Sequence, residues 1–402
     1  MTAASTNHAK APARVLLVTG AYFPEISSGG LQCQAVARHL GARGSFSVLT
    51  TATDAALASH ETIESIEVSR VYVDVENRGS KARAFLALLI ELLRRLPRTD
   101  AVHLQGFSRK NILIVTMAKL FGRPTVLSLQ TAVHDEPQTV AGQGRLAAWA
   151  YSSHDMYLSV SARLRDQYLH AGLPPDRIRL VPNGVDVHRF APATVDGRAT
   201  LRRRLGLPLE RPIVLFVGMF SHDKQPRILF DAWLGLQRDP ALALTLVFVG
   251  ATQSAYYEID PQLAPAMRAD AANAAVADRL VFVEPTHQVH EYFRAADFFS
   301  LPSAREGLPI ALLEAMSTGL PCVASRLPGS TDTIVEDGVN GRLVPPGDAE
   351  ALASALTVFL RDRAVGARMG ERARETVLQR YGIGPVAEAW MDAYATVLGE
   401  RA

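Results

Sequence analysis

The sequence predicts an α/β protein with two doubly wound domains that face a central cleft. Short β-branched and apolar runs alternate with longer helical patterns along most of the chain, which is typical of βαβ units in parallel sheets. The pattern starts again with a new apolar run at Ile213, after a stretch rich in proline, glycine and charge. A length of 402 residues, 48% of them hydrophobic, is sufficient for two or three domains with their own cores.

Strand candidates in the first half begin with residues 14–19, which a loop and a helical pattern over 31–44 follow. We interpret residues 1–13 as a flexible N-terminus and residues 14–190 as the first domain. The remaining strand candidates of this domain are residues 46–51, 69–75, 100–105, 124–130, 155–161 and 177–184.

The second half repeats this alternation, and its polar start at residues 191–210 is predicted to be an interdomain linker. Residues 211–380 form the predicted second domain, and 381–402 a C-terminal helix that can cross back to the first. A ligand is expected at the carboxyl ends of the parallel strands. The strand candidates are residues 213–218, 244–250, 279–285, 297–303, 321–327 and 341–346, with helical patterns at 290–296 and 311–319.

Composition excludes several classes of protein. The 42 Lys and Arg residues nearly balance the 40 Asp and Glu residues, which argues against a general nucleic-acid binder. The two cysteines, Cys33 and Cys322, lie far apart, so neither a disulfide scaffold nor a zinc knuckle is expected. No apolar run approaches the roughly 18 residues of a transmembrane helix, and residues 1–14 do not read as a secretory signal. We therefore expect a cytoplasmic location.

Candidate functional residues are most concentrated in the segment 301–325, LPSAREGLPIALLEAMSTGLPCVAS. A strand ends at Leu301, a helix is predicted to start near Pro309, and seven residues separate Glu306 in the loop from Glu314 inside the helix. The free N–H groups at a helix start suit a phosphate. Two carboxylates, one near sugar hydroxyls and one near a ribose, would hold a nucleotide-sugar at both ends. The alternative is a capped amphipathic helix with two solvated glutamates.

Two further sites contain residue types that suit a phosphate. Gly29 and Gly30 follow the first strand, where a tight turn would let the backbone approach a ligand. Lys224 follows the strand at 213–218 and can neutralise a diphosphate leaving group. The alternatives are a glycine-rich turn without a ligand and a solvated loop lysine.

Residues 279–349 resemble the C-terminal domain of family-4 retaining glycosyltransferases. The resemblance includes the Glu-(seven residues)-Glu pair and the run IVEDGVNGRLVPPGD at 334–348. In the first half, residues 158–190 resemble the interdomain signature of that family, so the likeness extends from about residue 14 to 348. It implies the GT-B fold, in which two Rossmann-like domains face a central cleft, the first on the acceptor side and the second binding the donor.

The same resemblance implies a retaining, metal-independent glycosyltransferase without a cofactor. Its substrates would be a nucleotide-diphosphate sugar, with a UDP-sugar favoured and GDP-mannose next, and an acceptor hydroxyl of a glycan, lipid or small-molecule natural product. Retention is expected to proceed on one face of the sugar, with the acceptor proton taken by the leaving phosphate.

The resemblance also implies a role for each matching residue. Glu306 would orient the sugar and favour positive charge on it, Lys224 would stabilise the diphosphate, and Gln130 would lie near the transferred sugar. No metal ligands are expected. The donor-binding residues would be Gly29, Gly30, Gly218, Lys224, Glu284, Gly307, Leu308, Pro309, Ile310 and Glu314.

The chain departs from the family pattern at two positions. Many relatives have an arginine where this chain has Met219, and Arg227 or Arg305 could substitute for it. Many also have a histidine where this chain has Gln130, whose amide can donate a hydrogen bond but cannot carry a proton charge. His134, four residues later, is the alternative.

Other functions stay open on the sequence. The rivals are a non-catalytic sugar-nucleotide-binding protein and another GT-B enzyme, such as a sugar phosphorylase or an epimerase. A dinucleotide oxidoreductase is disfavoured, because no G-x-G-x-x-G follows the first strand.

Residues 81–98 combine a dense apolar helical pattern with five basic residues. They predict either peripheral contact with an anionic membrane, which would place the protein at its inner face, or a helix that covers the sheet and has a solvated basic end. The second interpretation is favoured.

Overall fold

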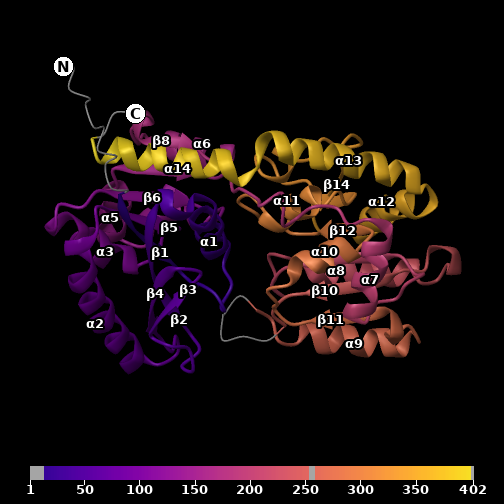
Figure 1. Cartoon of the computed structure of the whole chain (residues 1–402). Helices are drawn as coiled ribbons and strands as arrows, with labels where there is room; N and C mark the ends of the chain where they lie inside the picture. Colours follow the sequence, from indigo (N-terminus) through magenta and orange to yellow (C-terminus); the bar gives the residue numbers. More distant parts are fainter. Residues whose placement is uncertain (1–12, 253–258, 400–402) are drawn as a thin grey trace, which may run out of the picture.

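The computed structural model describes residues 13–252 and 259–399, which form two α/β units, each built on its own sheet (Figure 1). Most of the N-terminus expected to be flexible, residues 1–12, lies outside the described residues. The first sheet has the strand order β3-β4-β2-β1-β5-β6-β7-β8 and the second the order β11-β10-β9-β12-β13-β14. The prediction of two doubly wound α/β units is confirmed.

The first unit alternates strands and helices from Arg14 to Leu180. Five of the six residues of β1 are buried, as expected for a parallel strand covered by helices on both faces. The elements are β1 (Arg14–Thr19), α1 (Ser28–Leu40), β2 (Ser45–Ala52), β3 (His60–Ile63), β4 (Ile66–Tyr72), α2 (Arg78–Arg95), β5 (Ala101–Gln105), α3 (Lys110–Leu120), β6 (Thr125–Leu129), α4 (Pro137–Ala141), α5 (Arg145–Ser152), β7 (Met156–Ser159), α6 (Ala162–His170) and β8 (Ile178–Leu180).

The second unit has a purely parallel sheet, so its strands share one carboxyl edge. The elements are α7 (Val195–Leu205), β9 (Ile213–Val217), α8 (Pro226–Leu236), β10 (Thr245–Val249), α9 (Leu263–Asn273), β11 (Leu280–Val283), α10 (Val289–Ala295), β12 (Phe298–Leu301), α11 (Ile310–Ser317), β13 (Cys322–Ser325), β14 (Arg342–Val344), α12 (Ala349–Arg361) and α13 (Arg363–Arg380). The last helix of the chain is α14 (Ile383–Val397).

The structure differs from the sequence prediction at the edge of the first sheet. The edge strand β3 was not predicted, because its sequence HETI has neither an apolar run nor alternation, and three of its four residues are exposed. It pairs antiparallel with β4, so its hydrogen-bonding partner and not its own composition makes it a strand.

The segment expected to be a linker contains α7, which packs against α10 of the second unit. Arg202 of α7 is buried, where it donates to the carbonyl of Ala295 at 2.9 Å and pairs with Asp297 at 2.6 Å. This helix is therefore fixed to the second sheet rather than solvated between the units.

The C-terminal helix α14 lies against the first unit, across the top of the molecule in Figure 1. It packs on α1, and its Tyr394 hydroxyl lies 2.8 Å from Nδ1 of His103 on β5. Trp390 is buried in the same cluster. The chain thus ends on the unit where it began, and this return joins the two units.

Candidate active site

A cavity of about 570 Å³ lies between the two units, at the carboxyl ends of β1, β9 and β10. This volume is within the roughly 300–1,000 Å³ range of small-molecule sites. The first unit contributes residues 23–27 and the start of α1, and the second contributes 217–219, 249–251, 284–287 and part of α11. The cavity is therefore shared by the two units, as expected for a doubly wound pair.

Five of the predicted donor-binding residues line this cavity. They come from four separate segments of sequence, which the fold brings to one place. These residues are Gly30, Gly218, Glu284, Ile310 and Glu314.

Lys224 and Glu306 form an ion pair, although 82 residues separate them in sequence. The lysine Nζ lies 2.7 Å from Oε1 and 2.8 Å from Oε2 of the carboxylate, and Ser303 Oγ donates to the same Oε1 at 2.7 Å. Glu306 is only 8% exposed, so its charge is held by the lysine and the hydroxyl rather than by bulk water. Two of the three side chains predicted to be catalytic, Lys224 and Glu306, are thus placed together.

The start of α11 presents the backbone amides expected of a phosphate site. The helix begins at Ile310, and Pro309 precedes it with a ψ of 111°, so the proline lies just outside the helix rather than at its first position. The preceding loop is fixed by Asn183, whose Nδ2 donates to the carbonyl of Leu308 at 2.9 Å. Free N–H groups from Ile310 onward are therefore held beside the cavity.

Gly307 allows the two units to approach closely. A Cβ atom at this position would lie 2.0 Å from the backbone oxygen of Gln130, a distance no real contact allows. Only glycine therefore lets the loop that carries Glu306 touch the end of β6.

Gln130 lies in a network at this contact. Its Nε2 donates to Oε1 of Gln105 at 2.8 Å, and its backbone N–H donates to Asp135 at 2.7 Å. Asp135 also accepts from the backbone N–H groups of Phe107 and Thr131, and burial raises the pKa of this carboxyl against the effect of those hydrogen bonds. The Oε1 of Gln130 is buried and has no partner among the described residues.

The structure distinguishes the two arginines that could replace the missing cation at Met219. Arg227 of α8 pairs with Asp231 and Asp270, away from the cavity. Arg305 pairs with Asp223, and its Nη2 lies 3.3 Å from Nε2 of His134. Arg305 and His134 therefore meet beside the Lys224–Glu306 pair, whereas Arg227 does not.

Gly29 lies in the first turn of α1, where a Cβ would be 2.7 Å from Cβ of Gln105. It packs on the neighbouring strand end and does not line the cavity. Gly30 lines it, and its N–H donates to Ser27 Oγ at 3.1 Å, which caps the helix. The predicted glycine pair is thus divided between packing and the cavity wall.

The sequence reasoning missed several residues of the cavity wall. Arg189 donates to the carbonyl of His287 at 2.6 Å and joins the two units there. Phe23 packs its ring against that of His287 at 3.5 Å between centroids. None of these residues stands in a pattern that marks a ligand site, because they reach the cavity from three distant loops.

Glu314 projects from α11 into the cavity wall. Burial raises the pKa of its carboxyl to about 8, and the guanidinium of Arg189 opposes this effect. At neutral pH this carboxyl is therefore mostly protonated.

The Glu314 carboxyl predicts a pH dependence of stability. Its folded pKa lies above its unfolded value near 4.5, so between these values the folded protein binds a proton that the unfolded chain lacks. Stability should then fall as the pH rises through this window. We expect the melting temperature of the native chain to drop, relative to that of Glu314→Gln, between about pH 5 and pH 8. Differential scanning calorimetry measures this, with Glu371→Gln on the exposed face of α13 as the control. If the melting temperatures of the native chain and of Glu314→Gln changed with pH in the same way, the raised pKa of Glu314 would be contradicted.

Two general features complete the description of the site. Among residues 13–252 and 259–399, no group of three His, Cys, Asp or Glu side chains is placed to hold a metal ion. No helix in the described part of the chain combines the length and apolarity needed to cross a bilayer.

Each of the two units matches a known protein family. Residues 30–189 match the family model described as Glycosyltransferase Family 4, and residues 197–376 match that of Glycosyl transferases group 1. The boundary between the two matches falls just before α7.

Individual relatives agree with these matches. The chain is 30% identical to the alpha-maltose-1-phosphate synthase of Mycolicibacterium smegmatis over 69% of its own length and 74% of that protein. It is 32% identical to a D-inositol 3-phosphate glycosyltransferase of Xylanimonas cellulosilytica, over 66% of this chain and 62% of that protein. The chain thus spans less than two thirds of the length of that second relative.

Solved structures share the fold at lower identity. The structure of Anabaena HepE with UDP and glucose superposes with a TM-score of 0.77 at 18% identity, over 96% of this chain and 100% of that chain. Sucrose-phosphate synthase from Thermosynechococcus elongatus gives a TM-score of 0.72 at 20% identity, over 96% and 99% of the two chains. With its two parallel-sheet units and these matches, the chain belongs to glycosyltransferase family 4 and has the GT-B fold.

Proposed function

We propose that this protein is a retaining glycosyltransferase that moves a sugar from a nucleotide-diphosphate donor to an acceptor hydroxyl, without a metal ion. The observation that carries the proposal is the Lys224–Glu306 pair, whose glutamate lies in the loop before α11; the pair itself does not line the cavity, but Ile310 at the start of that helix does. One cation, one buried carboxylate and a set of free backbone amides are the groups that such a transfer requires.

In this proposal the second unit binds the donor. The diphosphate lies between Lys224 and the amides from Ile310 onward, and the base lies along residues 284–286. Glu314 binds the ribose hydroxyls. Because Lys224 contacts Glu306, a diphosphate bound beside the lysine would also lie close to the carboxylate. The ammonium group of Lys224 can then pair with both the diphosphate and the carboxylate of Glu306.

The chemistry is a substitution on one face of the sugar. The bond between the anomeric carbon and the phosphate oxygen breaks, and a bond to the acceptor oxygen forms on the same face. The acceptor proton passes to the leaving phosphate oxygen, so atoms and charge balance. Glu306 orients the sugar and stabilises positive charge on its ring, while Gln130 of the opposite unit, whose Nε2 donates to Gln105, offers as an acceptor its Oε1, which has no partner among the described residues.

The choice of donor rests on the comparisons. Anabaena HepE has been solved with UDP and with UDP-glucose, which supports a UDP-sugar as the donor. GDP-mannose is the second donor that we propose to test. The acceptor is a hydroxyl of a glycan, a lipid or a small-molecule natural product, and we place the reaction in the cytoplasm.

Donor hydrolysis tests the proposal without knowledge of the acceptor, since water can replace the acceptor hydroxyl. The protein is incubated with UDP-glucose, UDP-galactose and GDP-mannose in EDTA, and NMR follows the released nucleotide and the configuration of the first sugar formed. We expect release of one nucleoside diphosphate, with the anomeric configuration retained and no loss of rate in EDTA.

Three outcomes of this experiment would contradict the proposal. Formation of a sugar 1-phosphate only when phosphate is added would indicate a phosphorylase. Conversion of the donor sugar without nucleotide release would indicate an epimerase. Nucleotide binding without turnover for any donor or acceptor would indicate a binding protein.

A further inference from the structure

Helix α2 has two apolar faces, only one of which the fold uses. Leu88 and Leu92 are buried in the core of the first unit, as is Leu96 directly after the helix. The opposite face carries Leu86, Ile90 and Leu93, spaced by four and three residues. Leu86 is 57% exposed and Leu93 47%, and Phe85 beside them is 56% exposed. The covering role predicted for this helix therefore accounts for only half of its apolar residues.

The exposed face is flanked by positive charge. The basic side chains Arg78, Lys81, Arg83, Arg94 and Arg98 all lie on exposed residues of α2 or of the turn that follows it. Arg123 adds another cation at that end, where its Nε donates to the carbonyl of Leu96 at 3.2 Å.

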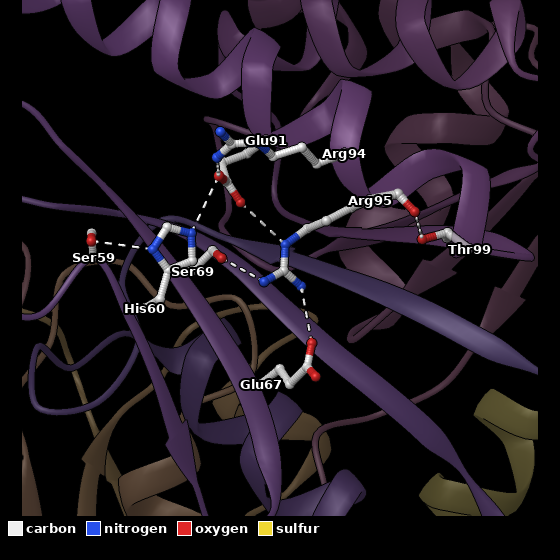
Figure 2. A network of polar contacts seen from close by, with 8 residues as sticks. All are labelled: Ser59, His60, Glu67, Ser69, Glu91, Arg94, Arg95 and Thr99. Atoms are coloured by element: carbon white, nitrogen blue, oxygen red, sulfur yellow. Dashed lines mark hydrogen bonds and ion pairs between the residues drawn. The ribbon is translucent and has the colours of Figure 1, made fainter.

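The one carboxylate of α2 offsets only part of this charge. Glu91 is only 7% exposed, and it contacts His60 of β3, Arg95 and Arg94, as Figure 2 shows. Arg95 also contacts Ser69 and Glu67 of β4. Glu91 therefore pairs with Arg94 and Arg95, and the other basic side chains of the outer face have no carboxylate of α2 as a partner.

The position of the helix relates this face to the cavity. α2 begins after the carboxyl end of β4 and ends before the amino end of β5, and both strands are parallel to β1 in one sheet. The N-terminal turns of α2, with Lys81, Phe85 and Leu86, thus lie toward the carboxyl edge at which the cavity opens.

We infer that the outer face of α2, defined as Phe85, Leu86, Ile90 and Leu93 with Lys81, Arg83, Arg94 and Arg98, docks on a bilayer that contains anionic lipid. An apolar stripe edged by arginine and lysine fits such a surface, since the apolar side chains enter the interface and the cations meet lipid phosphates. Charge complementarity selects an anionic bilayer over a neutral one. This inference does not depend on the proposed function, because binding is measured without turnover.

Vesicle co-sedimentation of the full chain tests the inference. The vesicles contain either phosphatidylcholine alone or phosphatidylcholine with about one third phosphatidylglycerol. We expect binding to the anionic vesicles only, and weaker binding as salt is raised. Each basic residue removed should cost about fivefold in partitioning, so Arg83→Glu with Arg98→Glu should lose at least 25-fold, about fivefold squared.

Variants of the apolar residues and a matched control separate the apolar contribution to vesicle binding from the electrostatic one. Leu86→Ser with Leu93→Ser should lower partitioning by about tenfold on anionic vesicles, because both side chains leave the interface. Leu378→Ser with Arg372→Glu, both on exposed positions of α13, should leave it unchanged. Circular dichroism and UDP binding of each variant confirm that the fold is intact.

Several results would overturn the inference. These are equal binding to neutral and anionic vesicles, no binding to either, and unchanged binding in both α2 variants. A chain that sediments as a dimer by ultracentrifugation, and as a monomer only with Leu86→Ser and Leu93→Ser, would show instead that the face binds a second copy.

Discussion

Replacement of Glu306 by glutamine is expected to lower the rate of sugar transfer by about 1,000-fold while leaving the affinity for UDP within about threefold. The carboxylate is held by Lys224 and Ser303 at the loop before α11, and we propose that it faces the sugar rather than the nucleotide. Glutamine keeps the shape and the hydrogen bond from Ser303 but removes the negative charge that stabilises positive charge on the sugar ring. The rate constant kcat is measured by UDP release, and the affinity by calorimetry.

A surface variant serves as the control for Glu306→Gln. Glu388 of α14 is a carboxylate paired with Arg43, but unlike Glu306 it lies on an exposed surface of the first unit. Glu388→Gln should therefore retain the native kcat. If Glu306→Gln transferred sugar at the native rate, Glu306 would have no place in the mechanism. An equal loss of UDP affinity would instead assign Glu306 to nucleotide binding.

Replacement of Lys224 by alanine is expected to weaken the binding of the nucleoside diphosphate by about 100-fold. The lysine supplies the cation on one side of the proposed diphosphate site, and Met219 cannot replace it because methionine carries no charge. The variant also leaves Glu306, which is 8% exposed, without its counter-cation, so the protein should melt at a lower temperature even without nucleotide.

A thermal-shift panel measures both effects of Lys224→Ala. The ligands are UDP, GDP, ADP, dTDP and NAD, and a ligand at 100 times its dissociation constant adds about 2.7 kcal/mol to the free energy of unfolding. We expect one nucleoside diphosphate to raise the melting temperature of the native chain and to lose most of that shift in Lys224→Ala. Lys119→Ala, on an exposed position of α3, should retain the shift. A shift with NAD alone, or with no ligand, would contradict the proposed donor class.

Much of the fold could be predicted from the sequence because parallel strands are buried on both faces. The run IVLFV at β9 is apolar throughout and TLVFV at β10 is apolar except for its first residue, and such runs can be recognised without knowledge of their partners. The edge strand β3 was missed for the opposite reason, since HETI is polar and becomes a strand only through its pairing with β4. The helix α7 was interpreted as a linker, because its burial depends on Arg202 reaching Asp297 of another segment.

The residues of the site also fall into those that the sequence indicates and those that only the structure reveals. Glu306, Glu314 and Lys224 stand in local patterns around strand ends and a helix start, so the sequence alone could mark them as candidates. Their arrangement could not be predicted, because 82 residues separate the two members of the ion pair. Arg189, His287 and Phe23 reach the cavity from distant loops, and although Arg189 lies in the segment that resembles the interdomain signature, none of the three was marked as a site residue.

The sequence by itself determined the two α/β units, the family and the identity of the candidate catalytic residues, because these depend on local periodicity and on short motifs. The tertiary structure decided that Lys224 contacts Glu306, that Gly307 lets the two units touch at Gln130, and that Arg305 rather than Arg227 lies beside the pair. It also showed that the outer face of α2 stays exposed. These are contacts between segments far apart in the chain, and no local pattern encodes which distant groups will meet.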